Sequence, residues 1–234
     1  LDTLRSPAVS SHRRDGISMH HEHAARARAT LVALAVAGAL FSAACTGGAG
    51  VVDPGKALAK GREFYAAGDY DKARLEFRNA LQAAPDDAEA RYENGRVAER
   101  QGNLREALKF YESALEANPD HVGARASLAR MYVFAAQPER AMELVRPGLE
   151  KQPDDATLLT IRSSARAQLR DVPGAFQDAE RAYALDPKAE AAVIQLAALF
   201  LANARSDRAR ELLEKGAADL PESEDVRVTL AQLY

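Results

Sequence analysis

Five prolines recur at a fixed interval of 34 residues, and this spacing constrains the fold more than any other feature of the 234-residue chain. Only 10 prolines occur in the sequence, so four further prolines in the phase of the first are not a chance arrangement. A period between about 20 and 50 residues indicates stacked copies of one supersecondary unit. The five prolines are Pro85, Pro119, Pro153, Pro187 and Pro221.

Placing each proline at position 32 of its unit defines five complete repeats and the start of a sixth. Position 20 is alanine in all five, and positions 8 and 27 are always Gly, Ala or Ser. Small residues at fixed positions let two helices of about 14 residues approach closely, and each proline ends the second helix because it lacks an N–H. With no Trp and only 7 Phe, the composition argues against an all-β sandwich or barrel. The repeats span 54–87, 88–121, 122–155, 156–189 and 190–223, and a truncated sixth spans 224–234.

This pattern resembles the tetratricopeptide repeat (TPR) family, through the 34-residue period, the small residues and the helix-ending prolines. The resemblance implies an all-α fold, a right-handed α-α superhelical solenoid of helical hairpins over residues 54–234. It also implies a concave groove, lined by the first helix of each repeat, that binds protein or peptide partners.

Two departures from the pattern lead to separate expectations. Arg162 and Arg166 occupy positions 7 and 11 of repeat 4, where apolar residues are expected. We therefore expect the first helix of that repeat to be rotated or locally irregular. Repeat 6 stops at Tyr234, inside its first helix, and solenoids normally end in a polar capping helix. We therefore expect the chain to be a fragment of a longer protein.

The N-terminal 44 residues have the features of a targeting segment. An uncharged run of 14 residues, Leu31 to Ala44, follows two arginines; it is too short for a membrane span and suits a signal peptide. With Cys45 directly after it, the segment resembles a bacterial lipoprotein signal, which implies cleavage before Cys45 and lipid attachment to it. An ordinary secretory signal and a short uncleaved anchor are the alternatives. Met19 is the expected translation start.

The anchor would leave residues 45–53 as a flexible, Gly-rich tether. In lipoproteins an Asp after the Cys often retains the protein at the inner membrane. Thr46 stands there, which favours the outer membrane, facing the periplasm of the bacterial envelope. We expect no metal site at the clustered His20, His21 and His23, since no helix or carboxylate set supports one.

A row of arginines is the candidate partner-binding feature. Position 9 of the first three repeats is arginine, and aromatic residues fall at other groove positions. Arginine can bind a carboxylate through two parallel hydrogen bonds and can stack on aromatic rings. One interpretation is a groove for an acidic or C-terminal peptide segment. The candidate residues are Arg62, Arg96, Arg130, Tyr65, Tyr92 and Phe134.

The alternative is that these arginines form a solvated polar stripe paired with Glu89, Glu93 and Glu99. The Lys–Asn carboxylate clamp known from the family is not expected, because no Asn stands at position 9. Repeat 5 differs, with apolar residues at groove positions, which fits either a docked peptide or tight superhelical packing. These residues are Ile194, Ala198 and Leu201.

Other function classes find little support in the sequence. The formal net charge is −3, so a dedicated nucleic-acid binder is not expected, and one Cys excludes an internal disulfide. No catalytic motif occurs, and we expect no enzyme activity, cofactor, metal or small-molecule substrate. His121 follows Pro119-Asp120 between repeats 2 and 3 and is predicted to be an exposed loop residue.

The sequence thus predicts a TPR scaffold lipoprotein that holds protein partners at the bacterial cell envelope. Its layout is most similar to TPR lipoproteins of exopolysaccharide and exosortase (PEP-CTERM) systems. Alternatives are a type IV pilus assembly lipoprotein, the recruiting region of a larger enzyme such as a glycosyltransferase or peptidase, and a cytoplasmic chaperone adaptor that would need residues 31–44 not to be a signal.

Overall fold

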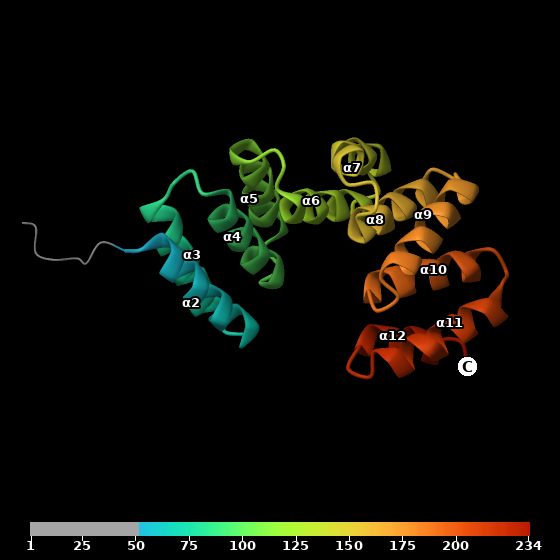
Figure 1. The fold of residues 1–234 in the computed structure, drawn as a ribbon. Coiled ribbons are helices and arrows are strands. Elements are labelled where there is room, and N and C mark those ends of the chain that lie inside the picture. The colour runs from blue at the N-terminus through green and yellow to red at the C-terminus, as the bar shows by residue number, and fades with distance from the viewer. Residues whose placement is uncertain (1–51) are drawn as a thin grey trace, which may run out of the picture. The chain divides into compact units, whose positions relative to one another are not determined.

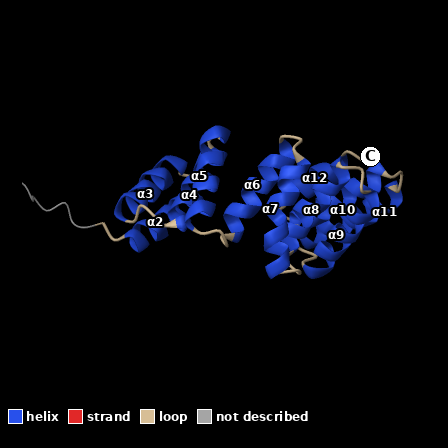
Figure 2. Ribbon diagram, turned by 90° about the horizontal axis from the view of Figure 1, so that it is seen from above, coloured by secondary structure: helices blue, strands red, loops and turns tan. Residues whose placement is uncertain are grey.

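The computed structural model describes residues 52–234, and this part of the chain consists of helices joined by short loops, with no strand (Figure 2). The eleven helices of residues 52–234 alternate between a first helix of 13 residues and a second of 14, and the last has 8. They are α2 (Pro54–Ala66), α3 (Tyr70–Ala83), α4 (Ala88–Arg100), α5 (Leu104–Ala117), α6 (Val122–Phe134), α7 (Pro138–Lys151), α8 (Ala156–Gln168), α9 (Val172–Leu185), α10 (Glu190–Ala202), α11 (Ser206–Asp219) and α12 (Glu224–Ala231).

Each helical hairpin packs on the next, which confirms the predicted all-α solenoid. Every second helix packs on its own first helix and on the first helix of the following repeat. The first helices lie on the inner side of the arch that residues 52–234 form (Figure 1). The predictions for residues 1–44, for Cys45 and for most of the 45–53 tether lie outside the described residues.

The small residues that the repeat pattern singled out lie where the two helices of a hairpin touch. The alanines at position 20, Ala73, Ala107, Ala141, Ala175 and Ala209, are fully buried. A Cβ placed on Gly61 would lie 2.4 Å from Phe77, and one on Gly95 would lie 2.6 Å from Tyr111. Glycine at position 8 is therefore required where an aromatic ring fills position 24 of the same repeat.

The turn within each hairpin needs a residue in the left-handed region, and the repeats meet this need differently. Gly68 and Gly102 have φ of 76° and 77°, and glycine adopts this conformation without steric cost. The equivalent residues of repeats 3, 4 and 5 are Ala136, Arg170 and Ala204, with φ of 53°, 64° and 58°. Their Cβ atoms make these three turns strained.

The expected rotation of the first helix in repeat 4 is wrong. Helix α8 has the same length as the other first helices, and Ser163 at position 8 is fully buried, as in the other repeats. Arg162 and Arg166 keep their expected places and instead pair with Asp178 of α9, whose side chain is 3% exposed. The two contacts of Arg162 are both 2.7 Å. A buried carboxylate in the second helix thus replaces the apolar contact.

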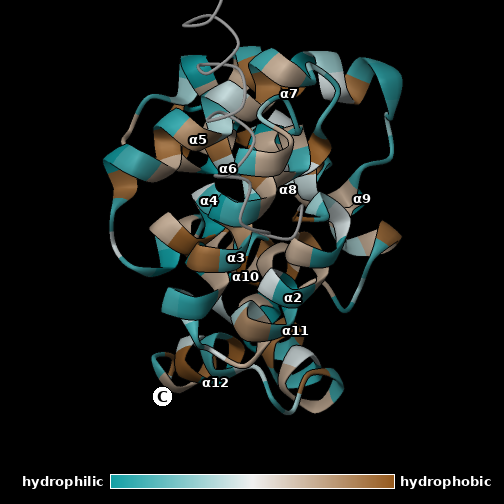
Figure 3. Cartoon of the chain, turned by 90° about the vertical axis from the view of Figure 1, so that its left-hand side faces the viewer, coloured by the Kyte–Doolittle hydropathy of each residue, from teal (hydrophilic) through white to brown (hydrophobic). Residues whose placement is uncertain are grey.

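Apolar and hydrophilic stretches alternate along the helices (Figure 3), but the contacts between first helices change along the solenoid. Helices α6, α8, α10 and α12 pack directly on one another in sequence. Within residues 52–234, no comparable approach joins α2 to α4 or α4 to α6. The space between these three helices is crossed by long polar side chains, and they form the candidate site.

Candidate functional site

A polar cavity of about 650 Å³ opens on the inner face of repeats 1 to 3. All of its lining residues belong to first helices, which places it in the predicted groove. It brings together four of the six predicted site residues. The lining consists of Tyr65, Tyr92, Arg96, Glu99, Arg100, Ser127 and Arg130.

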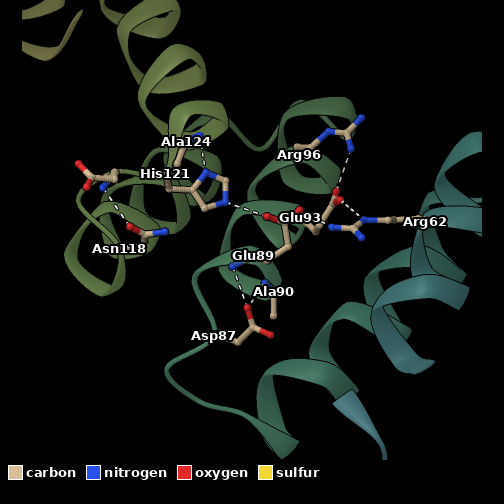
Figure 4. Close-up of polar contacts among 10 residues, drawn as sticks. Arg62, Asp87, Glu89, Ala90, Glu93, Arg96, Asn118, His121 and Ala124 are labelled. Atoms are coloured by element: carbon tan, nitrogen blue, oxygen red, sulfur yellow. Dashed lines mark hydrogen bonds and ion pairs between the residues drawn. The ribbon is translucent and has the colours of Figure 1, made fainter. Parts of the chain in front are cut away.

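Glu93 is the buried anion beneath this cavity. Its side chain is 2% exposed and accepts hydrogen bonds from Arg62 Nε at 2.7 Å and Arg96 Nη1 at 2.9 Å (Figure 4). A carboxylate so removed from water requires this pairing. The hydrogen bond to Glu93 is the main cause that raises the pKa of Arg62 above its usual value. Glu93 thereby fixes two of the three predicted arginines in one orientation.

Arg96 also lies between two aromatic rings. Its guanidinium carbon is 4.1 Å from the centroid of Tyr65 and 5.9 Å from that of Tyr92. Such cation–π contacts hold the guanidinium over the ring faces. Arg100 Nε donates to the Tyr65 hydroxyl at 3.1 Å. The cavity therefore presents cationic groups against aromatic walls.

The third predicted arginine, Arg130, closes the cavity from α6. Its Nη2 lies 3.7 Å from Glu99 Oε1. The hydroxyl of Tyr111 donates to the other oxygen of Glu99 at 2.5 Å. Burial, followed by the hydrogen bond to Glu99, raises the pKa of Tyr111 far above its usual value, so the phenol stays a neutral donor.

Each predicted arginine is thus paired with glutamates that the polar-stripe alternative named. Arg62 contacts Glu89 as well as Glu93. Arg62 does not line the cavity, and it is linked to the cavity-lining Arg96 only through Glu93, which both arginines contact. A ligand carboxylate would meet Arg96, Arg100 and Arg130 across the cavity, with Glu99 as the one carboxylate in its lining. The geometry suits an acidic ligand group that binds these arginines in addition to their glutamate partners.

The prediction that His121 is an exposed loop residue is wrong. Its side chain is 10% exposed, and its ring centroid lies 4.8 Å from that of Tyr92. Nδ1 accepts a hydrogen bond from the backbone N–H of Ala124 at 3.1 Å and so caps α6, while Nε2 lies 3.0 Å from Glu89 Oε2 (Figure 4). Asp87 and Asp155 cap α4 and α8 at the equivalent position. His121 combines this cap with packing against Tyr92 and Glu89, which buries its side chain.

Phe134 does not line the arginine cavity. It is 86% exposed and lines a different, largely apolar cavity together with Leu108 and Met131. The two cavities adjoin, because Glu99 and Arg130 line both.

The inner face of repeats 3 to 5 holds a second cavity, of about 530 Å³, with a different lining. Thr160, Ile161 and Ile194 contribute to it. Of the apolar groove residues predicted in repeat 5, Ile194 lines this cavity, whereas Ala198 and Leu201 do not.

Sequence reasoning missed a set of arginines at position 4 that link consecutive repeats. Arg91 Nη2 donates to the carbonyl oxygen of Pro85 at 2.8 Å, and Arg125 and Arg227 donate in the same way to Pro119 and Pro221. The guanidinium satisfies a carbonyl that the helix-ending proline leaves free. The signal was available, because an arginine follows six residues after each of these prolines.

Two further searches gave negative results for the part of the chain that the structure describes. Residues 52–234 contain no group of three His, Cys, Asp or Glu side chains placed to hold a metal ion. None of the helices in the same range has the length and apolar character needed to cross a membrane.

Comparison with known proteins points to one repeat family. Two models of the tetratricopeptide repeat match residues 58–122 and 98–169. A crystal structure of a thermophilic TPR protein from Thermus thermophilus is 26% identical, with a TM-score of 0.69 over 77% of this chain and 98% of that one. No curated protein matches the chain.

Two more distant structures share the fold. MamA from Desulfovibrio magneticus RS-1 is 16% identical, with a TM-score of 0.58 over 74% of this chain and 99% of its own. YrrB, described as a TPR protein with an unusual peptide-binding site, is 18% identical, with a TM-score of 0.53 over 77% of this chain and 92% of its own.

Proposed function

Because the chain is built of tetratricopeptide repeats, we propose that it is a scaffold that binds an acidic segment of a protein partner in the arginine-lined cavity of repeats 1 to 3. The TPR family as a whole suggests protein–protein interaction rather than catalysis. The observation that carries the finer proposal is the arrangement of Arg96, Arg100 and Arg130 around one cavity with aromatic walls.

The chemistry of the cavity favours carboxylates over other ligands. Glu93 already satisfies Arg62 and holds Arg96 against Tyr65, so the site is preorganised before a ligand arrives. A guanidinium pairs with a carboxylate through parallel hydrogen bonds, and the rings of Tyr65 and Tyr92 supply apolar surface beside it. An extended acidic peptide or a chain terminus combines these features.

We further propose that the scaffold is attached to a bacterial membrane through a lipid on Cys45, facing the periplasm, with the outer membrane favoured. The support is the sequence alone, namely the apolar run from Leu31 to Ala44 directly before the single Cys. Within such an envelope, a role in exopolysaccharide or exosortase-linked assembly is our preferred setting. A type IV pilus assembly role is the alternative.

Binding can be tested with acidic peptides on an array, each synthesised as a free acid and as an amide. Arg62 and Arg96 should be left in place, because they neutralise the buried Glu93. The variant R100E/R130E is expected to lose at least about tenfold in affinity through charge repulsion. R208E/R210E, which reverses two arginines of the second helix α11, is the matched control. Equal binding by both variants would refute the proposed site.

Membrane attachment has its own test, independent of the groove. We expect the wild-type chain in the membrane fraction of a bacterial host and the C45S variant in the soluble fraction, because the thiol carries the lipid. The intact mass of the membrane form should include the lipid. Identical fractionation of both chains would remove the lipoprotein proposal while leaving peptide binding untouched.

A further inference from the structure

A second surface lies at the seam between consecutive repeats, where a second helix faces the turn of the following repeat. At each seam, positions 18 and 21 of one repeat face positions 14 and 19 of the next repeat. Since the repeats are copies of one unit, each seam provides an internal comparison for the others.

The seam between repeats 1 and 2 is closed by polar side chains. Arg74 Nη1 donates to Gln101 Oε1 at 3.0 Å, and Arg74 Nη2 donates to the two oxygens of Glu106 at 2.6 and 2.8 Å. Gln101 Nε2 donates to Asp71 Oδ1 at 2.9 Å. Four residues from α3, α5 and the turn between α4 and α5 therefore fill this seam with a continuous hydrogen-bond network.

The seam between repeats 4 and 5 is closed by aromatic packing instead. Phe176 of α9 and Phe200 of α10 have ring centroids 5.5 Å apart. The guanidinium of Arg205 covers Phe176 at 5.0 Å from its centroid. Two unrelated chemistries thus achieve the same closure at these two seams.

The seam between repeats 2 and 3 has neither this hydrogen-bond network nor a pair of aromatic rings. The guanidinium of Arg140 lies 5.5 Å from the ring centroid of Tyr132, and a cavity of about 750 Å³ remains open. Leu108 stands where Arg74 stands one repeat earlier, and Ala135 replaces Gln101. Met131 and Tyr132 also line the cavity, with the 86% exposed Phe134 beside them. An exposed aromatic ring next to an unfilled apolar cavity marks an interaction site rather than a packing position.

The charges at this seam are the reverse of those in the closed polar seam. Arg105 and Arg140 occupy the positions of Asp71 and Glu106, so two cations replace two carboxylates. Both arginines are exposed and line the cavity together with Leu108. The charged residues of the cavity lining are three arginines, Arg105, Arg130 and Arg140, and two glutamates, Glu99 and Glu112, and Glu99 pairs with Arg130. The complement of this apolar interior with its surplus of arginines is an apolar side chain flanked by carboxylates.

We propose that the open seam between repeats 2 and 3 docks a segment of a partner protein in which an aromatic or aliphatic side chain is flanked by Asp or Glu. The apolar side chain enters the cavity beside Phe134 and Leu108, and the flanking carboxylates pair with Arg105 and Arg140. This surface adjoins the arginine cavity, because Glu99 and Arg130 line both, but the four residues named here line only the seam.

The repeats themselves supply the variant that closes the seam. L108R/A135Q/R140E transplants the Arg74, Gln101 and Glu106 network one repeat along the solenoid. A peptide library displayed on phage is selected on the full wild-type chain, with the closed-seam variant as counter-selection. We expect the enriched peptides to carry an aromatic or aliphatic residue between acidic residues, and to bind the closed-seam variant at least about tenfold more weakly.

A second variant keeps the test decisive if the triple substitution perturbs folding. R105E/R140E alters only exposed side chains, and it should weaken the acidic peptides and favour versions in which Lys replaces Glu. R208E/R210E on α11 should bind as the wild type does. Failure to enrich any peptide over the closed-seam variant would overturn the proposal, as would enriched peptides without acidic residues.

Other occupants of the open seam would give different results in these experiments. If the wild type dimerises in sedimentation experiments and the closed-seam variant does not, the occupant is a second copy of the chain and the partner proposal is wrong. The single variant R100E shows which proposal has failed, because Arg100 lines the arginine cavity and not the seam, whereas Arg130 lines both. Peptides that bind R100E and not the closed-seam variant would support the seam even if the groove binds nothing.

Discussion

The two halves of this solenoid join their first helices by different means. In repeats 1 to 3, polar side chains cross the space between α2, α4 and α6, and the buried Glu93 is their centre. In repeats 4 and 5 the first helices approach one another directly, and their buried residues, such as Leu158, Val193 and Phe200, belong to apolar cores. The same backbone unit therefore leaves polar side chains between first helices in one half and direct helix contacts beside apolar cores in the other.

The difference teaches that a repeat fold separates its structural positions from its functional ones. The contacts within each hairpin keep their small residues along the whole chain, as Ala73 and Ala209 show. The contacts between first helices vary freely, because the second helices already hold neighbouring repeats together. Binding sites can therefore arise between first helices, or at an open seam, without loss of the solenoid.

The largest expected effect tests the apolar half. Leu213 is fully buried in the core shared by α10, α11 and α12. L213A should destabilise repeat 5 by about 2–5 kcal/mol, through lost burial and the cavity it leaves. Denaturant unfolding measures the loss, and hydrogen exchange locates it in α10 and α11. L185A, at the exposed end of α9, should be near neutral, and a similar loss in both variants would contradict this account.

A smaller effect is expected in the polar half. E93Q keeps the shape of the side chain but removes the charge that holds Arg62 and Arg96, both of which can regain water. We expect a loss of about 1–3 kcal/mol, together with weaker binding of acidic peptides. E63Q, an exposed change on α2, serves as the control. If E93Q costs as much as L213A, the contrast between a polar and an apolar half does not hold.

Substitutions in the turns are expected to change the stability of the chain in opposite directions in different repeats. A136G and A204G should each stabilise the chain by about 1 kcal/mol, because alanine is strained at positive φ. G68A should destabilise by a similar amount, since Gly68 has φ of 76°. A198G, on the exposed face of α10, should also destabilise, because glycine weakens a helix interior. A loss of stability in A136G, measured by thermal unfolding, would refute the strain.

The smallest effect is that of salt. Raising NaCl to about 1 M should lower the hydrogen-exchange protection of α4 by less than about 1 kcal/mol, since Arg62 is half exposed and its ion pairs are screened. Protection of α10, which packs through apolar residues, should stay the same or increase. Equal weakening of both helices would show that charge does not distinguish the halves.

Local rules of the sequence predicted the helices but not the residues that the polar side chains contact. Prolines, small residues and turn glycines act within about one helical turn or one hairpin, so their effects can be read along the chain. Arg162 and His121 were misjudged because their partners, Asp178 and Glu89, lie 16 and 32 residues away. The sequence showed the row of arginines at position 9. It did not show that Arg62 and Arg96 contact Glu93 while Arg96 and Arg130 line the cavity.

By itself, the 34-residue period determined that paired helices would stack into a solenoid, because each unit can bury its apolar faces only against its neighbours. Only the tertiary structure decided which of those junctions are filled. The closure of a seam depends on whether side chains from two repeats reach one another, as Arg74 reaches Glu106, whereas Leu108 at the same position lines an open cavity. Such distances are set by how the helices pack, and a sequence pattern does not contain them.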